Sequence, residues 1–83
     1  KELFQRWTEL GAFTPIMRTH EGADRDNNWS WKSDAETTAH FRRFVFVHCA
    51  LRDEFATLAA AAQVDGAPIL RHLMLEFPDD PET

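Results

Sequence analysis

A chain of 83 residues supports at most one small domain, whose hydrophobic core is marginal without partners or crosslinks. Apolar residues make up 43% and charged residues 28%, which is typical of a globular chain and excludes a disordered one. The net charge of −5 argues against nucleic-acid binding, no apolar run approaches the about eighteen residues that cross a bilayer, and the single cysteine excludes an internal disulfide.

The opening segment predicts an amphipathic helix, because four apolar residues recur there at spacings of three and four: Leu3, Phe4, Trp7 and Leu10. Gly11 predicts the end of this helix through a left-handed cap. Residues 13–20, with Pro15 among mixed side chains, predict a short strand with an irregular start. No capping residue precedes the apolar stripe and Lys1 is not a start methionine, so we expect the chain to be part of a longer protein.

Residues 21–33 predict a loop, because they are rich in Asp, Asn, Gly and Ser. Trp29 and Trp31 are unusual in such a loop, and we expect them to anchor it. Glu21 and Arg25 have two interpretations: they line the rim of a pocket, or they are ordinary solvated loop charges. The two indoles likewise either form a platform for a flat apolar ligand face or pack the loop onto its domain.

A long helix is predicted to follow this loop. Ser33 and Glu36 form an S-x-x-E capping box, a signal for the start of a helix. Apolar residues then follow the helical period, so the helix is expected to run from about Asp34 to Val64. Gly66 predicts its end, and Pro68 blocks its continuation.

The last segment, Ile69–Phe77, is a nearly continuous apolar run and predicts a second strand. The expected order is therefore helix, strand, loop, long helix, strand. This is the order of one α/β unit within a larger layered domain, and such a unit cannot close a sheet alone.

Three blocks of the chain carry a resemblance to a known family. The run R-W-T-E-L-G-A-F-T-P-I-M-R-T-H, Arg6–His20, resembles the segment R-W-x-x-x-G-A-F-x-P-x-x-R-x-H of the family 31 glycoside hydrolases, the α-glucosidase family. Residues 34–64 resemble the last barrel helix of that family. The stretch A-P-I-L-R-H-L-M-L-E-F-P-D-D is similar to the segment that leaves the barrel for a β-sandwich.

The resemblance implies an α/β fold: the C-terminal portion of a (β/α)8 TIM barrel, with its last helix, strand and helix, plus the first strand of the following β-sandwich. Residues 1–66 would belong to the barrel and residues 67–83 to the sandwich. Without the rest of the barrel, we expect the chain to be largely helical.

A finer resemblance lies in R-T-H-E-G, Arg18–Gly22, followed by Asn28 and Trp29. It is similar to the sulfoquinovosidase branch of the family, which releases 6-deoxy-6-sulfoglucose from its α-glycosides. The resemblance implies a retaining α-glycoside hydrolase that takes a carbohydrate substrate and needs no metal or organic cofactor. An ordinary α-glucosidase or α-xylosidase of the same family is the alternative.

By this resemblance, His20 binds the sugar in the cleavage subsite, at the end of the strand, where barrel enzymes form their active sites. Arg18 is a weaker candidate: two residues earlier, it is expected on the same side, either touching substrate or paired with a buried carboxylate. Neither catalytic carboxylate motif of the family occurs here. Asp34 and Glu36 are explained by the helix dipole, so we expect the isolated chain to be inactive.

The four histidines and Cys49 do not have the spacing of a metal site. One alternative of a different class stays open: a small helical interaction module, whose helix Asp34–Val64 docks on a partner or on itself. If the chain is instead part of a barrel, the uncovered apolar faces of this long helix predict self-association of the isolated chain.

Overall fold

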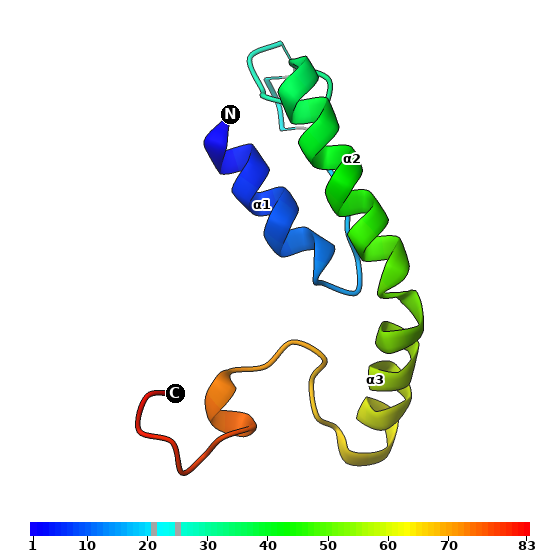
Figure 1. Ribbon diagram of the computed structural model, residues 1–83, viewed down its shortest axis with the longest axis vertical. Coiled ribbons are helices and arrows are strands. Elements are labelled where there is room, and N and C mark those ends of the chain that lie inside the picture. The colour runs from blue at the N-terminus through cyan, green and yellow to red at the C-terminus, as the bar shows by residue number, and fades with distance from the viewer. Residues whose placement is uncertain (21, 25) are drawn as a thin grey trace. The chain divides into compact units, whose positions relative to one another are not determined.

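The computed structural model describes residues 1–20, 22–24 and 26–83, and within these it is helical (Figure 1). Three α-helices occur in chain order, α1 (Glu2–Ala12), α2 (Ala35–Ala50) and α3 (Arg52–Asp65), and a short 3-10 helix, η1 (Leu73–Leu75), follows them. No strand forms among the described residues. The expectation that the chain is largely helical is confirmed. None of the helices is both long and apolar enough to span a membrane in the described part of the chain.

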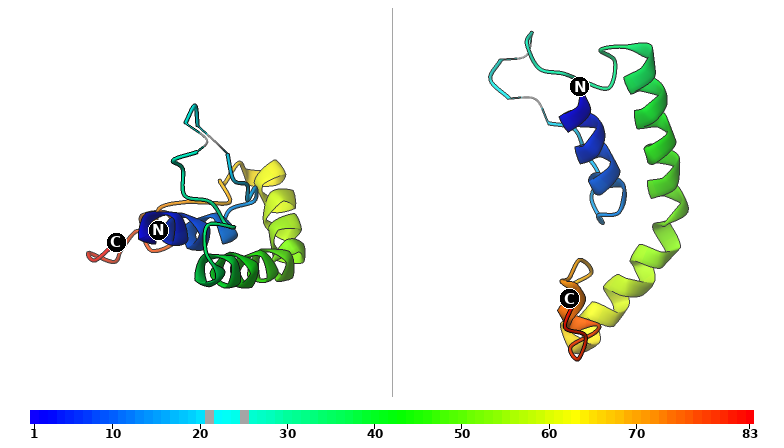
Figure 2. Two further views of the ribbon diagram at one scale, coloured as in Figure 1. Left: turned by 90° about the horizontal axis from the view of Figure 1, so that it is seen from above. Right: turned by 60° about the vertical axis from the view of Figure 1, so that its left-hand side comes forward.

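The chain divides into two compact units, Lys1–Arg52 and Asp53–Thr83. In the first unit, α1 and α2 lie side by side and run in the same direction (Figures 1 and 2). Near the start of both helices, the Lys1 amine lies 3.0 Å from the Asp34 carboxylate. Near the end of α1, the ring of His48 donates from Nδ1 to the carbonyl of Ala12 at 3.1 Å. The segment between the two helices therefore has to return along their length.

Contact between α1 and α2 relies on a few side chains. Thr8, Ala12 and Thr37 are buried, and Phe4 packs against Phe41 with their ring centroids 6.1 Å apart. No large apolar side chain is fully buried in the described part of the chain. This unit thus has the beginning of a core rather than a complete one.

The predicted strand at residues 13–20 is wrong for this structure, which shows a turn followed by irregular chain. A strand requires a neighbour with which to exchange backbone hydrogen bonds, and the described residues supply none. The predicted left-handed cap at Gly11 is also wrong, since α1 continues to Ala12 and the one glycine with positive φ in the described chain is Gly66. The Gly11 carbonyl instead accepts from the Thr14 hydroxyl at 2.7 Å, so no left-handed glycine is needed.

The N-cap of helix α2 is one residue later than the Ser33 of the predicted capping box. Asp34 is this N-cap, and the Asp34 carboxylate accepts from the backbone N–H of Thr37 at 2.7 Å. The Ser33 hydroxyl instead accepts from the Ser30 backbone N–H at 2.8 Å. Glu36, the other half of the predicted box, pairs with Lys1. Both Ser33 and Asp34 are good cap formers, and the aspartate takes the position.

The predicted single helix from 34 to 64 is two helices in the structure. Leu51 separates α2 from α3, with φ −86° and ψ 1°, and its backbone N–H is shared between the carbonyls of Val47 and His48. This is a local tightening to a 3-10 turn. The predicted end is confirmed at Gly66, which has φ 76° and whose N–H bonds to the Ala62 carbonyl at 2.9 Å.

The predicted strand Ile69–Phe77 is wrong in the second unit. Residues 73–75 form η1, and the His72 ring accepts from the Met74 backbone N–H at 3.2 Å. Arg71 and Glu76 form an ion pair at 2.6 Å across this turn. As at residues 13–20, no neighbouring strand is present among the described residues, and local hydrogen bonds are made instead.

The cap at Asp34 gives a testable dependence of helix content on pH. The backbone N–H and hydroxyl of Thr37 and the Lys1 amine together hold the pKa of Asp34 at about 2, below its ordinary value of 3.8. Because the folded pKa is the lower one, this stabilisation is complete above about pH 4 and is lost as the pH falls toward 2.

We therefore expect the helix content of the wild-type chain, measured by far-UV circular dichroism, to fall more steeply between pH 4 and pH 2 than that of Asp34→Asn. Asparagine is also a good cap and does not titrate. Asp79→Asn, in an exposed turn outside the helices, is the matched control. Parallel curves for wild type and Asp34→Asn would contradict the expectation.

Candidate functional site

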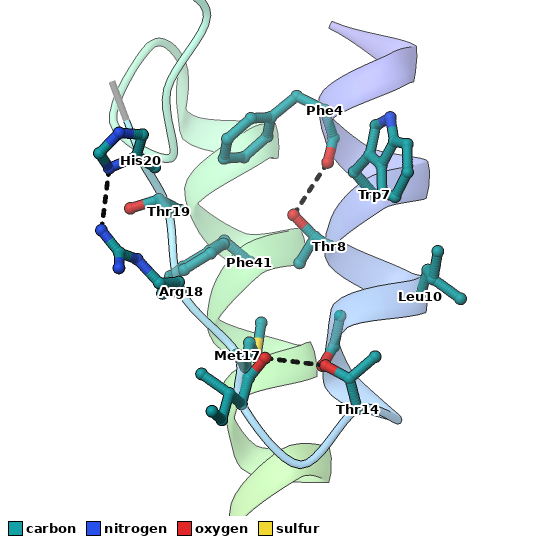
Figure 3. A pocket seen from close by; sticks show the side chains of 12 residues that line it. Phe4, Trp7, Thr8, Leu10, Thr14, Met17, Arg18, Thr19, His20 and Phe41 are labelled. Carbon is teal, nitrogen blue, oxygen red and sulfur yellow. Dashed lines mark hydrogen bonds between the residues drawn. The ribbon is translucent and has the colours of Figure 1, made fainter. Parts of the chain in front are cut away.

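The first unit contains a pocket of about 400 Å³ (Figure 3). It lies between α1, the segment 14–20 and one residue of α2. Its lining is Phe4, Trp7, Thr8, Leu10, Gly11, Thr14, Ile16, Met17, Arg18, Thr19, His20 and Phe41. The Thr14 hydroxyl, which bonds to the carbonyls of Gly11 and Ile16, fixes the turn from which the segment enters the pocket. The predicted site residues Arg18 and His20 both belong to this lining.

Arg18 and His20 contact each other directly. The guanidinium Nη2 of Arg18 lies 2.8 Å from Nδ1 of the His20 ring. A guanidinium can only donate, so Nδ1 accepts, and the proton of the neutral ring is on Nε2. The prediction that the two side chains share one side of the segment is confirmed. Both are exposed, and among the described residues no carboxylate pairs with Arg18.

The remaining walls of the pocket are largely apolar and incompletely covered. Trp7 is 63% exposed, Leu10 54% and Ile16 79%. The described lining includes no Asp or Glu. A concave apolar surface with a few polar groups at one edge is the usual form of a small-molecule site. In this arrangement the polar edge is Arg18, Thr19 and His20, and the contact with Arg18 leaves Nε2–H of His20 as the donor of that ring.

Two carboxylates of the first unit, those of Glu9 and Glu36, are instead committed to the contact between α1 and α2. The Glu9 carboxylate accepts from Nε2 of His40 at 3.0 Å and from Arg6 at 3.0 Å. Hydrogen bonding to His40, followed by that to Arg6, lowers the pKa of Glu9. Hydrogen bonding to Lys1 is the largest cause that lowers the pKa of Glu36. These groups are ionised and paired, which is a structural role rather than that of a free acid or base.

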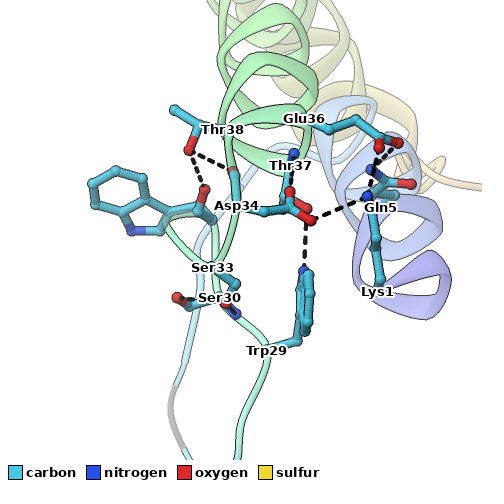
Figure 4. Close-up of polar contacts among 10 residues, drawn as sticks. Lys1, Gln5, Trp29, Ser30, Ser33, Asp34, Glu36, Thr37 and Thr38 are labelled. Atoms are coloured by element: carbon cyan, nitrogen blue, oxygen red, sulfur yellow. Dashed lines mark hydrogen bonds and ion pairs between the residues drawn. The ribbon is translucent and has the colours of Figure 1, made fainter.

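The loop before α2 is anchored by both of its tryptophans, as predicted. The indole N–H of Trp29 donates to the hydroxyl of Thr37 at 3.1 Å (Figure 4). The ring of Trp31 stacks on Phe41 with the centroids 6.3 Å apart and the planes at 24°. Thr37 was not recognised from the sequence, because nothing in the pattern marks a buried hydroxyl. Glu21 and Arg25, the two charged rim candidates, lie outside the described residues.

No group of three or more His, Cys, Asp or Glu side chains that could hold a metal ion occurs within the described ranges. His40 and His48, on α2, both bond to residues of α1. Cys49 is exposed and is not part of a disulfide. The chemistry that the described residues offer is therefore that of binding: hydrogen-bond donors beside an apolar wall.

Comparison with known proteins identifies the class. Residues 1–58 match the family described as the glycosyl hydrolases family 31 TIM-barrel domain. The chain belongs to glycoside hydrolase family 31, which confirms the resemblance seen in its sequence.

Two sulfoquinovosidases are among its relatives. The chain is 43% identical over 83 residues to the sulfoquinovosidase of Escherichia coli (strain K12). The alignment covers 100% of the chain and 12% of that relative. It is 42% identical over 82 residues to the sulfoquinovosidase of Agrobacterium fabrum (strain C58 / ATCC 33970), covering 99% of the chain and 12% of the relative. A probable glucan 1,3-alpha-glucosidase of Oryza sativa subsp. japonica is 38% identical over 82 residues, covering 99% of the chain and 9% of the relative.

The chain thus spans 12% of the length of each of the two sulfoquinovosidases. No solved structure is significantly similar to it.

Proposed function

We propose that this chain is part of a retaining α-glycoside hydrolase of the sulfoquinovosidase type. The observation that carries the proposal is the identity of 43% and 42% to two sulfoquinovosidases over nearly the entire chain. The R-T-H-E-G motif supports it, since the motif resembles that branch and its Arg18, Thr19 and His20 line the pocket. The substrate is accordingly an α-glycoside, and a sulfoquinovoside in particular.

Residues 1–66 are proposed to complete the catalytic (β/α)8 barrel, and residues 67–83 to begin the β-sandwich. The parallel course of α1 and α2 supports the first assignment. A barrel repeats helix and strand so that successive helices run in the same direction and the strand between them runs back. Residues 13–20 occupy the position of that strand in the chain, and neighbouring strands would give them the hydrogen-bonding partners that they lack here.

The proposed role of His20 is to hold the sugar in the cleavage subsite. Its Nε2–H is the donor left available by the contact with Arg18, and a sugar hydroxyl is a suitable acceptor. Such hydrogen bonds strengthen as the oxocarbenium-like transition state develops. Arg18 then fixes the tautomer of His20 and adds a cation to the same edge. Retention requires two carboxylates about 5 Å apart, which the rest of the full-length enzyme supplies.

An ordinary α-glucosidase is the second candidate. The observation in its favour is the identity of 38% to the probable glucan 1,3-alpha-glucosidase, again over nearly the whole chain. The described residues of the pocket edge can hydrogen-bond to either sugar, so the two candidates differ in residues that recognise a sulfonate elsewhere in the enzyme.

Hydrolysis of two chromogenic substrates by the full-length enzyme tests the proposal. We expect kcat/KM for an α-sulfoquinovoside to exceed that for the matching α-glucoside by at least about 100-fold, because a site that binds a buried charged group strongly disfavours a neutral analogue. The isolated 83-residue chain is the blank and is expected to be inactive. Preference for the glucoside would leave the family assignment and discard the branch. Activity on neither substrate would contradict the proposed function.

A further inference from the structure

We propose that the hydrogen bond between Trp29 and Thr37 is a positioning contact, which ties the loop after His20 to the first turn of α2 and thereby holds His20 in place. Trp29 and Thr37 are positioning residues in this proposal, because neither lines the pocket. The importance of His20 for the reaction rests on the proposed function. The contact itself is a property of the fold and can be measured separately.

The contact has a buried partner on the helix side. Thr37 has no exposed surface, and its hydroxyl accepts from the Trp29 indole at 3.1 Å. The backbone N–H of the same residue donates to the Asp34 carboxylate at 2.7 Å. The Lys1 amine lies 3.0 Å from that carboxylate. The acceptor for Trp29 is thus held from several sides, as Figure 4 shows.

The N-terminal cap of α2 does not require the Thr37 hydroxyl as a hydrogen-bond acceptor. Asp34 satisfies the backbone N–H of Thr37 with its own side chain, which is the usual N-cap interaction. The lone pair of the Thr37 hydroxyl is therefore available to the loop. A valine at this position would preserve shape and leave the indole N–H of Trp29 without its acceptor.

The described residues of the loop connect this anchor to His20. Asn28, directly before Trp29, lies beside Gly22: a Cβ on Gly22 would be 3.6 Å from Nδ2 of Asn28. Asn27 bonds to Asp24 at 2.8 Å within the same loop. Gly22 and Asn28 are therefore close to each other, and Gly22 is only two residues after His20. Fixing Trp29 on α2 also restrains Asn28, and the proximity of Asn28 to Gly22 extends this restraint toward His20.

The test uses the full-length enzyme with Thr37→Val, Trp29→Phe, the double variant and Thr37→Ser. Amide hydrogen exchange of peptides covering residues 15–24 and 26–33 measures the restraint. We expect either single variant to speed exchange in both peptides about fivefold, as for the loss of one hydrogen bond. The double variant is expected to match the single ones, because all three lack the same contact. Thr37→Ser retains the hydroxyl and is expected to exchange like the wild type.

The kinetic readout separates positioning from general loss of stability. We expect kcat to fall about fivefold in Thr37→Val with KM nearly unchanged, because a displaced His20 loses interactions that matter most in the transition state. Thr57→Val is the matched control, since within the described chain its hydroxyl bonds to the Asp53 carbonyl on α3, at 3.0 Å. It is expected to leave kcat, KM and exchange of both peptides unchanged.

Unchanged exchange of the 15–24 peptide in Thr37→Val would overturn the proposal, as would additive effects in the double variant or equal effects in Thr57→Val. If the wild-type enzyme hydrolyses no α-glycoside, the proposed function fails. Amide hydrogen exchange of the two peptides would then still decide whether the Trp29–Thr37 contact restrains the segment that carries His20.

Discussion

Replacing His20 by alanine in the full-length enzyme is expected to lower kcat/KM by about 100-fold. A hydrogen bond to a group that becomes charged is worth about 1.5–3 kcal/mol, and a factor of ten corresponds to about 1.4 kcal/mol. Most of the loss is expected in kcat, because in the proposed role of His20 the bond from Nε2 would strengthen in the transition state. Initial rates over a range of substrate concentrations separate the two constants.

His72→Ala is the matched control for this experiment. His72 is also exposed, but it lies in the second unit, where its ring accepts from the Met74 backbone. We expect it to leave kcat/KM within about twofold of the wild type, as for most surface substitutions. A His20→Ala enzyme with unchanged kcat/KM would show that the histidine is a loop residue satisfied by its neighbours. A change in KM alone would assign it to ground-state binding.

The isolated chain is expected to self-associate, which follows from its uncovered apolar surface. On α1, the exposed fractions are 71% for Leu3, 63% for Trp7 and 54% for Leu10. Their spacing places them along one side of the helix. An apolar stripe of this kind on a small soluble chain promotes association. Sedimentation velocity is expected to show a dimer or larger species instead of a 9.6 kDa monomer.

Charged residues in the stripe test the cause of this association. Trp7→Lys combined with Leu10→Glu is expected to shift the chain toward the monomer, and Lys32→Glu, on the exposed loop, is the control that leaves it unchanged. The result also bears on the alternative of a small interaction module. A monomeric wild-type chain that unfolds cooperatively would favour that module over part of a barrel.

The helices could be predicted from the sequence because their signals are local. Apolar periodicity located α1 and most of α2 and α3, and Gly66 marked the end of α3. The interruption at Leu51 has no glycine or proline to announce it. The cap was misplaced by one residue because Ser33 and Asp34 both suit the position, and the pairing of Lys1 with Glu36, distant in sequence, was not accessible to a local rule.

The strands could not be predicted reliably because a strand is not a property of one segment. Residues 13–20 and 69–77 have apolar character, but their backbone groups need neighbours that the described chain does not include. The candidate site shows the same difference between features with a local signal and features that depend on neighbouring residues. The contact between Arg18 and His20 agrees with the side expected from their spacing, although the strand behind that expectation does not form. The role of Thr37 depended on burial, which spacing does not reveal.

The parallel course of α1 and α2 has a consequence for how such an enzyme can change. A return along α1, with its 11 residues, covers about 16 Å at 1.5 Å per residue. At about 3.3 Å per residue, an extended chain needs only about five residues for that distance. The connection from residue 13 to residue 34 is much longer, so it has more residues than the return requires. Insertions or deletions after His20, which lines the pocket, would leave both helices in place, and this makes the loop a natural place for specificity to diverge.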